Sequence, residues 1–255
     1  MLLRIDGLGK RYLHADGPVD ALRDVSLDVE AGTFLTITGP SGSGKTTLLL
    51  AVGGLLRPTS GRILFRDREI QALSDAQRAE FRRRHVGFVL QSFSLIPYLS
   101  ALRNVAVPLG LRGAGLEEQE EGARKALEEV GLGGRAHHLP RELSAGQQQR
   151  VAIARAMVTD PALLLADEPT GNLDPGLARD ILGLLRSLHE RKGITILMVT
   201  HSPEAAAQGD VRAHLVEGRL DRLERGRSGT EPGSRRPLPQ GAPAAASATE
   251  PTAEP

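Results

Sequence analysis

The chain has 255 residues, which is enough for one sizeable α/β domain or two small ones with a real core. Its 32 Lys and Arg residues nearly balance its 31 Asp and Glu residues, and the resulting net charge of +1 argues against a polyanionic partner such as DNA. The absence of cysteine excludes disulfides, thiolate metal sites and a cysteine nucleophile.

The N-terminal part of the chain, to about residue 64, has the patterns of β-strands. Residues 25–32 (VSLDVEAG) and 33–39 (TFLTITG) are alternating or continuous apolar runs that end in glycine. Residues 45–56 (KTTLLLAVGGLL) predict a helix, which is ended by the following Arg-Pro and the turn PTSG. Another short strand is predicted over residues 86–91 (VGFVLQ).

The middle of the chain, from residue 92 to about 157, changes to helical patterns with few β-branched runs. Within it, residues 115–131 carry charges at helical spacing, which indicates a helix with a solvated face. Two continuous apolar runs follow, at 162–169 (ALLLADEP) and 194–201 (ITILMVTH), and the helical segment 176–193 separates them. This order predicts a βαβ unit in a buried parallel sheet.

The composition changes sharply after Glu224. Residues 225–255 are rich in Pro, Ala, Gly and Ser and contain almost no large apolar side chain, so they cannot bury enough surface to offset the entropy of ordering. We therefore expect one domain over residues 1–224 and a disordered tail over 225–255, which is dispensable unless it docks a partner.

A glycine-rich segment, GPSGSGKT, lies between the predicted strand 33–39 and the predicted helix. It matches the pattern G-x-x-x-x-G-K-[ST] in full. Glycines let the backbone curl so that N–H groups converge on phosphate oxygens, and the helix N-terminus adds its dipole. We expect Lys45 to contact the β- and γ-phosphates and the Thr46 hydroxyl to bind Mg²⁺. The predicted nucleotide-binding residues of this phosphate loop are Gly39, Pro40, Ser41, Gly42, Ser43, Gly44, Lys45, Thr46 and Thr47.

Two acidic residues, Asp167 and Glu168, follow the apolar run ALLLA. Adjacent carboxylates at the end of a buried strand are costly unless a cation is near. We expect Asp167 to hold Mg²⁺, directly or through water, and Glu168 to polarise the water that attacks the γ-phosphate.

The segment ELSAGQQQR, residues 142–150, contains the start of a helix. Ser144 and Gln147 have the spacing of a capping box, just ahead of a periodic apolar run. This local pattern leaves open whether Ser144 only caps the helix or also belongs to an active site. We expect Gln148 and Gln149 to lie at the surface.

Six ordered motifs resemble the ATP-binding cassette (ABC) family over roughly residues 1–224. They are the phosphate loop, Gln91 after VGFVL, LSAGQ at 143–147, LLLADEP, GNLD at 171–174 and VTH ending at His201. The resemblance implies an α/β P-loop NTPase with a RecA-like core. It also implies an N-terminal antiparallel β-subdomain and an inserted α-helical subdomain over about 92–157.

The resemblance further implies a head-to-tail dimer, in which each ATP lies between the phosphate loop of one copy and the LSGGQ signature of the other. Gln91 would then contact Mg²⁺ and the attacking water, and His201 would contact the γ-phosphate. Tyr12 would stack on adenine, and Asp174 would join the two sites across the dimer interface. The signature residues, which would act in trans, are Ser144, Ala145, Gly146 and Gln147.

Two residues depart from the family pattern. Ala145 replaces the first of the two usual signature glycines, and Ser202 follows His201 where Asp is common. Alanine is well tolerated at the first position of a helix, and the second glycine, Gly146, is kept. We therefore expect both ATP sites of a homodimer to be competent.

Within the family, the segments LLAVGGLLRPTSG, LADEPTGNLD and FSLIPYLSALRNVAVPL resemble the ATPases of lipoprotein-release, macrolide-export and cell-division systems. This implies a subunit that hydrolyses ATP and powers a separate membrane permease of the exporter or mechanotransmission type. The alternative is a cell-division-type ATPase that regulates envelope enzymes without transporting solute. An ABC ATPase acting on DNA or the ribosome is disfavoured, because no long coiled coil is inserted and the chain has one cassette.

The N-terminus carries charges from Arg4 onward, unlike a secretory signal, and no stretch approaches the roughly 18 apolar residues of a spanning helix. We therefore expect a cytoplasmic protein without direct membrane insertion, held at the inner face of the membrane by its permease. Four apolar residues after Gln91 could form the groove that receives the permease's coupling helix, or could belong to the core. They are Phe93, Leu95, Ile96 and Leu99.

Overall fold

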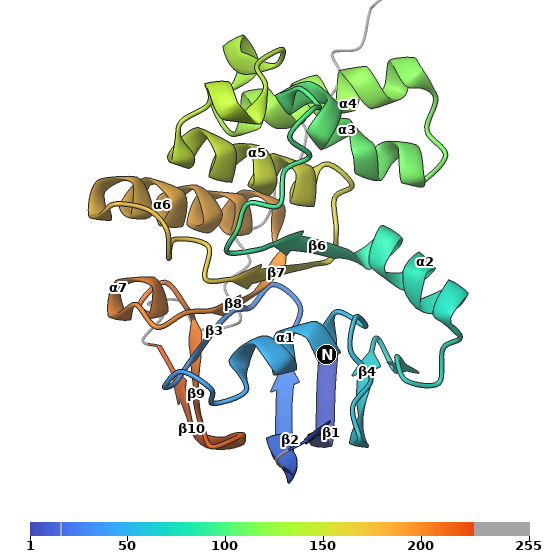
Figure 1. Ribbon diagram of the computed structural model, residues 1–255, viewed down its shortest axis with the longest axis vertical. Helices are drawn as coiled ribbons and strands as arrows, with labels where there is room; N and C mark the ends of the chain where they lie inside the picture. The colour runs from blue at the N-terminus through green and yellow to red at the C-terminus, as the bar shows by residue number, and fades with distance from the viewer. Residues whose placement is uncertain (16, 227–255) are drawn as a thin grey trace, which may run out of the picture.

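The computed structural model of the chain describes residues 1–15 and 17–226, so the expected tail lies outside the described residues apart from positions 225 and 226. The described chain forms two β-sheets with a group of helices at one end (Figure 1). The last strand runs to Arg225, one residue beyond the expected end of the domain.

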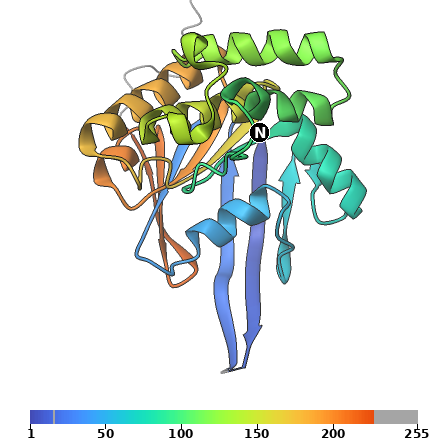
Figure 2. The same cartoon turned by 45° about the horizontal axis from the view of Figure 1, so that its top comes forward.

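The first sheet is antiparallel and contains the N-terminus, in the order β2-β1-β4-β5. Its β1–β2 hairpin extends well beyond the rest of the molecule (Figure 2). Buried and exposed residues alternate toward the end of β2, as in a sheet with one covered face. The strands are β1 (Leu3–His14), β2 (Gly17–Val29), β4 (Ser60–Phe65) and β5 (Arg68–Glu69).

The second sheet has the order β10-β9-β3-β8-β7-β6 and is parallel except for β10 at its edge. The strands β7 and β8 are parallel neighbours joined through helix α6 (Pro175–Lys192), which confirms the predicted βαβ unit. The strands are β3 (Phe34–Thr38), β6 (Val86–Val89), β7 (Leu163–Asp167), β8 (Thr195–Val199), β9 (Val211–Val216) and β10 (Arg219–Arg225).

Three helices, α3, α4 and α5, lie between β6 and β7 in the chain and pack on one another at the top of Figure 1. They occupy the region that was expected to be helical. The α-helices other than α6 are α1 (Lys45–Val52), α2 (Asp75–His85), α3 (Ala101–Leu111), α4 (Leu116–Glu129), α5 (Ala145–Met157) and α7 (Pro203–Ala206). Two short 3₁₀ turns, Gly133–Arg135 and Pro140–Glu142, precede α5.

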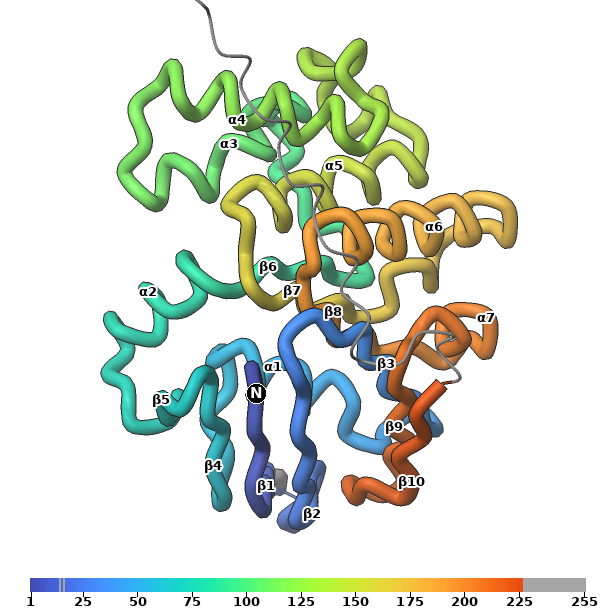
Figure 3. The backbone as a smooth tube through the Cα atoms, turned by 180° about the vertical axis from the view of Figure 1, so that it is seen from behind, coloured from blue at the N-terminus to red at the C-terminus, as the bar shows by residue number. Residues whose placement is uncertain are grey.

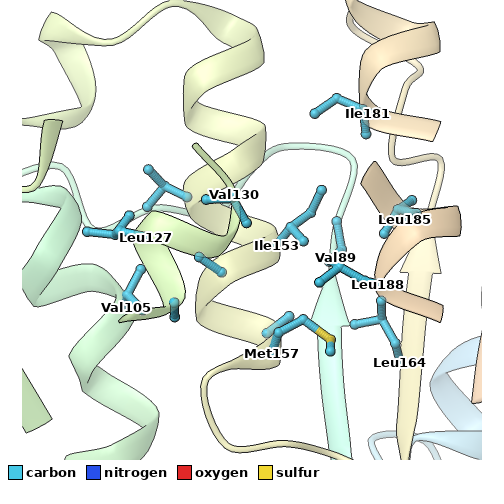
Figure 4. Close-up of a cluster of buried hydrophobic side chains, with 14 of the residues drawn as sticks. Val89, Val105, Leu127, Val130, Ile153, Met157, Leu164, Ile181, Leu185 and Leu188 are labelled. Carbon is cyan, nitrogen blue, oxygen red and sulfur yellow. The ribbon is translucent and has the colours of Figure 1, made fainter. Parts of the chain in front are cut away.

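Helix α5 joins the helical group to the parallel sheet. Ile153 and Met157 of α5 belong to one buried apolar cluster with Leu127 of α4, Leu164 of β7 and Leu185 of α6 (Figure 4). Burying a side chain of this size contributes about 1.5–3 kcal/mol. Helix α5 is therefore packed between the helical group, represented by α4, and the elements β7 and α6.

Helix α1 is shorter than predicted, because it ends at Val52 and not at residue 56. Gly53 forms its C-cap, and Gly54 follows with a φ of +66°, a left-handed conformation that stops an α-helix. The apolar residues Leu55 and Leu56 continued the helical pattern in the sequence, but the two glycines decide the end of the helix.

The two sheets meet where β2 passes the turn between β9 and β10, which lie side by side in Figure 3. The Arg23 N–H donates a hydrogen bond to the Gly218 carbonyl over 2.7 Å. The Gly218 N–H in turn donates to the Ser43 carbonyl over 3.2 Å. This turn therefore holds the phosphate loop against the antiparallel sheet.

Candidate functional site

The phosphate loop follows β3 and can be formed only with glycine at its two ends. Gly39 and Gly44 have φ values of +146° and +96°, which side chains rarely adopt. A Cβ atom on Gly39 would collide with the Leu215 carbonyl oxygen, and one on Gly44 would collide with the Ala21 carbonyl oxygen. Neighbouring strands thus press on the loop from both sides and fix its path.

The Lys45 side chain lies across the phosphate loop and is 8% exposed. Its Nζ donates hydrogen bonds to the carbonyl oxygens of Gly39, over 2.9 Å, and Pro40, over 2.8 Å. A single ammonium group therefore closes the loop on itself and places a positive charge inside it. This is the position at which the sequence predicts a phosphate contact.

Asp167 ends β7 close to the start of α1. The Thr46 hydroxyl donates to its Oδ1 over 3.2 Å, so two of the three expected metal ligands lie together. Burial raises the pKa of the Asp167 carboxyl, and the charge of Glu168 acts in the same direction. The hydrogen bond from Thr46 and the charge of Lys45 oppose this rise in pKa. A partly buried carboxyl next to a second one is a position that favours a cation.

Glu168 has a φ of +47°, and its side chain reaches His201 beyond the end of β8. Its Oε2 lies 2.8 Å from Nδ1 of His201 and accepts a hydrogen bond from the His201 backbone N–H over 3.4 Å. The strands β7 and β8 are parallel neighbours, so their carboxyl ends bring these two residues together. The Glu168 side chain is 14% exposed and that of His201 is 68% exposed.

One cavity of about 420 Å³ joins these groups. It collects predicted residues from three separate loops and the end of β8, at positions far apart in the sequence. Ala21 of β2 also lines it, although no motif marks this residue, because its carbonyl oxygen lies against Gly44. The lining residues are Ala21, Ser41, Gly42, Ser43, Gly44, Lys45, Thr46, Thr47, Gln91, Asp167, Glu168 and His201.

Ser144, Asp174 and Tyr12 are not among the lining residues of this cavity. Ser144 forms the predicted capping box of α5, because its Oγ accepts from the Gln147 N–H over 3.3 Å and its N–H donates to Gln147 Oε1 over 3.0 Å. Asp174 caps α6 through Oδ1, which accepts from two backbone N–H groups. The half-buried Tyr12 ring lies 5.0 Å from Nζ of Lys10.

Gln149 is not at the surface, contrary to expectation. Gln149 is 1% exposed, and its Nε2 donates to the Pro169 carbonyl over 2.6 Å. Gln148 is half-buried and donates to the Leu143 carbonyl over 3.1 Å. The spacing could have revealed Gln149, since it lies four positions before the buried Ile153 and so shares its helix face.

The four apolar residues after Gln91 form neither an exposed groove nor a fully buried core. All four are half-buried, and among them Leu95 packs against the cluster that contains α5 and α6. Asn104 of α3 secures this segment, because its Oδ1 accepts from the Ile96 N–H over 2.7 Å.

Comparison with known proteins decides the family. Residues 22–171 match the family model for ABC transporters. The chain belongs to the ABC transporter family. It is 48% identical to an uncharacterised ABC transporter ATP-binding protein of Thermotoga maritima, over 85% of this chain and 92% of that protein. It is 45% identical to the lipoprotein-releasing system ATP-binding protein LolD of Myxococcus xanthus, over 86% of this chain and 98% of that protein.

A third relative is larger. The macrolide export ATP-binding/permease protein MacB of Rhodopirellula baltica is 42% identical over 92% of this chain, which spans 34% of that protein. Among solved structures, the dimeric cassette MJ0796 bound to ADP and Pi superposes with a TM-score of 0.82 at 39% identity. That match covers 88% of this chain and 98% of the MJ0796 chain.

These relatives confirm the ABC cassette fold, the binding of ATP and the ATPase class expected from the sequence. They do not favour the cell-division alternative, since the named relatives belong to lipoprotein release and macrolide export. None of the helices in residues 1–15 and 17–226 combines the length and apolarity needed to cross a bilayer.

Proposed function

We propose that this chain is the ATP-hydrolysing subunit of a transport complex of the lipoprotein-release or macrolide-export kind, and that it powers a separate membrane permease. The observation that carries the proposal is the cavity that joins the phosphate loop to Gln91, Asp167, Glu168 and His201. The match to a lipoprotein-releasing ATP-binding protein, over 86% of this chain and 98% of that protein, supports the choice of system. The chain would then work at the inner face of the membrane. Its ATPase domain would comprise residues 1–224, with a helical subdomain over about 92–157.

The residues of the cavity divide the work of hydrolysis. The N–H groups of the phosphate loop and Lys45 hold the phosphates, with the N-terminus of α1 adding its dipole. Glu168 accepts a proton from the attacking water, and its contact with His201 over 2.8 Å keeps the carboxylate aimed at the end of β8. Gln91, which lines the same cavity, orients the water. Little covalent chemistry is required of the chain, because positioning and charge supply the rate.

The residues present fit a Mg²⁺ ion. The hydroxyl of Thr46 and a carboxylate oxygen of Asp167 lie 3.2 Å apart, and hard oxygen ligands of this kind are those that Mg²⁺ prefers. Gln91 would complete the set. The ion, once bound, would neutralise the charge that develops on the phosphates.

Chelation of divalent cations is expected to abolish ATP turnover. Asp167→Asn should raise the Mg²⁺ concentration needed for half-maximal turnover by about tenfold or more, because it removes a ligand charge. Titration of turnover with Mg²⁺ measures this. Asp160→Asn is the control, since Asp160 is an exposed residue paired with Lys192 and should leave the titration unchanged. A Mg²⁺ requirement that Asp167→Asn does not alter would contradict the metal assignment.

A second copy of the chain would complete the site. The signature residues Ser144, Ala145, Gly146 and Gln147 lie outside the cavity of their own copy, and the matched MJ0796 cassettes are dimeric. In a head-to-tail dimer, Ser144 and the N-terminus of α5 would meet the γ-phosphate held by the partner. Asp174 would lie at the interface, and Tyr12 would stack on adenine.

Ser144→Ala should lower the free energy of unfolding by about 1 kcal/mol through loss of the cap. If Ser144 also contacts the partner's ATP, turnover of the folded protein should fall by about tenfold or more. Ser74→Ala is a matched control, because Ser74 and Gln77 form the same capping box on α2, with the same 3.3 Å and 3.0 Å hydrogen bonds. Equal effects of the two substitutions on turnover would leave Ser144 as a cap only.

The permease assignment has a direct test. The tagged chain is purified from membranes of its own organism in mild detergent, and the proteins that remain bound are identified. We expect an integral membrane protein, and we expect its presence in liposomes to change the rate of ATP turnover. Active ATPase that retains no membrane protein would refute the transport role while leaving the enzymatic one intact.

A further inference from the structure

The Gln91 loop, residues 90–100 between β6 and α3, contains a strained backbone. Phe93 and Ser94 have φ values of +47° and +49°. Side-chain-bearing residues rarely adopt this left-handed conformation, and two in succession persist only when surrounding groups impose it. Something outside the loop must therefore hold it.

The group outside the loop that holds the two strained residues is the guanidinium of Arg155 on α5. Its Nη1 donates to the Ser94 carbonyl over 2.7 Å, and its Nη2 donates to the Phe93 carbonyl over 3.0 Å. The planar fork of arginine directs two separate N–H groups at two adjacent acceptors in a fixed geometry, whereas a lysine would have to share one ammonium group between them. Burial lowers the pKa of Arg155, and among residues 1–15 and 17–226 no carboxylate forms an ion pair with it. In the described part of the chain, the Arg155 side chain is therefore paired with the carbonyls of Phe93 and Ser94.

Gln149 of the same helix makes the corresponding contact with a second loop. The side chain is fully buried, and its amide donates to the carbonyl of Pro169, the residue that follows Glu168. Glu168 also has a positive φ, of +47°. Helix α5 therefore holds two segments. One is the Gln91 loop, and the other is the backbone directly after Glu168, the proposed general base.

The two loops are also joined to each other. Nδ2 of Asn172 donates to the Gln91 carbonyl over 2.9 Å. Helix α5, the Gln91 loop and the segment 169–172 thus form a closed triangle of hydrogen bonds. The closed triangle restricts how far Gln91 and Glu168 can shift relative to each other.

We propose that Gln149 and Arg155 are positioning residues for ATP hydrolysis, which make α5 a brace that fixes Gln91 and Glu168 at the geometry needed for attack of water. The inference rests on the proposed function and deepens it. Helix α5 begins at Ser144, so the brace connects this copy's own catalytic loops to the signature that would meet the partner's ATP. Neither Gln149 nor Arg155 lines the cavity, and both act through backbone carbonyls.

The same helix supplies matched controls. Gln148 donates to the Leu143 carbonyl over 3.1 Å, and Arg150 donates through Nη1 to the Val130 carbonyl over 3.0 Å. Both bonds are partly buried and of the same chemical kind as those of Gln149 and Arg155. They end within the helical group and reach neither the Gln91 loop nor the segment 168–172, so their loss leaves the proposed brace intact.

The experiment compares Gln149→Met and Arg155→Met with Gln148→Met and Arg150→Met in the full chain. The measurements are kcat and KM for ATP, the unfolding temperature, and hydrogen exchange of the amides in residues 91–97. The brace predicts that kcat falls by about tenfold or more in the first pair, because small misplacements of reacting groups can cost up to about 10²-fold. KM should change by less than about threefold, since the phosphate loop is untouched, and Arg155→Met should speed exchange in residues 91–97.

The control pair should keep kcat within about twofold of wild type even where the unfolding temperature falls. Arg155→Lys, which keeps the charge but lacks the planar two-pronged fork, serves if Arg155→Met does not fold and should give an intermediate kcat. Equal kcat in both pairs, or a loss of kcat that follows unfolding temperature across all four variants, would overturn the brace. Glu168→Gln distinguishes failure of the brace from failure of the proposed function, because normal turnover in that variant would refute the proposed function itself.

Discussion

Glu168→Gln is expected to lower ATP turnover by about 10²- to 10⁴-fold, the range that a general base contributes, while ATP binding stays near that of wild type. The glutamine has the same shape, so the positive φ at this position and the hydrogen bond from the Glu168 N–H to the Val199 carbonyl should persist. The glutamine amide cannot take a proton from water, and the substitution removes the carboxylate that contacts His201.

Because binding survives while hydrolysis stops, this variant should accumulate as an ATP-bound dimer. Phosphate release measures turnover, a fluorescent ATP analogue measures affinity, and size-exclusion chromatography with ATP measures the dimer. Glu204→Gln is the control, as an exposed carboxylate in the first turn of α7 that does not line the cavity. Turnover near wild type in the Glu168 variant would exclude the base assigned here.

The second large effect is expected for Lys45→Ala, which should lower turnover by about 10²- to 10³-fold and weaken ATP binding as well. Lys45 is the buried ammonium inside the phosphate loop, and its two carbonyl contacts show that the loop is shaped around a positive charge. With alanine the loop loses both its internal closure and the charge that would meet the phosphates.

Lys45→Ala differs from Glu168→Gln in its effect on binding, so the pair separates phosphate recognition from water activation. The same turnover and affinity measurements apply, with thermal unfolding as a check that the protein is folded. Lys125→Ala is the matched control, because Lys125 is an exposed residue of α4 paired with Glu121. A Lys45 variant that binds and hydrolyses ATP normally would remove the basis for the phosphate-loop assignment.

Several features were predictable because they depend on residues close together in the chain. The capping box at Ser144 and Gln147 is set within one helical turn. The phosphate loop is similarly fixed by glycines at set intervals, and the βαβ unit of β7, α6 and β8 by two apolar runs with a helix between them. For such patterns the local free energies already favour one conformation.

Helix α2, Asp75–His85, was missed although its start was readable. Ser74 and Gln77 form a capping box of the same kind, but the helix contains a single fully buried residue, Phe81, so no apolar periodicity follows the cap. The strands β9 and β10 were missed for a related reason, since only part of β9 is buried and β10 is exposed apart from one half-buried residue. Helix α1 was predicted too long because its apolar pattern continued past Gly53.

The sequence by itself determined the cassette, the phosphate loop and most of the residues that line the cavity beside it, because these are encoded by residue types at fixed spacing. Only the tertiary structure decided that Gln149 is buried and that Arg155 holds the Gln91 loop 61 residues away. A glutamine or arginine side chain is equally polar whether it lies at the surface or in the interior. Whether its donors meet water or a distant carbonyl depends on which segments pack against the helix, and that is fixed only when the whole chain folds.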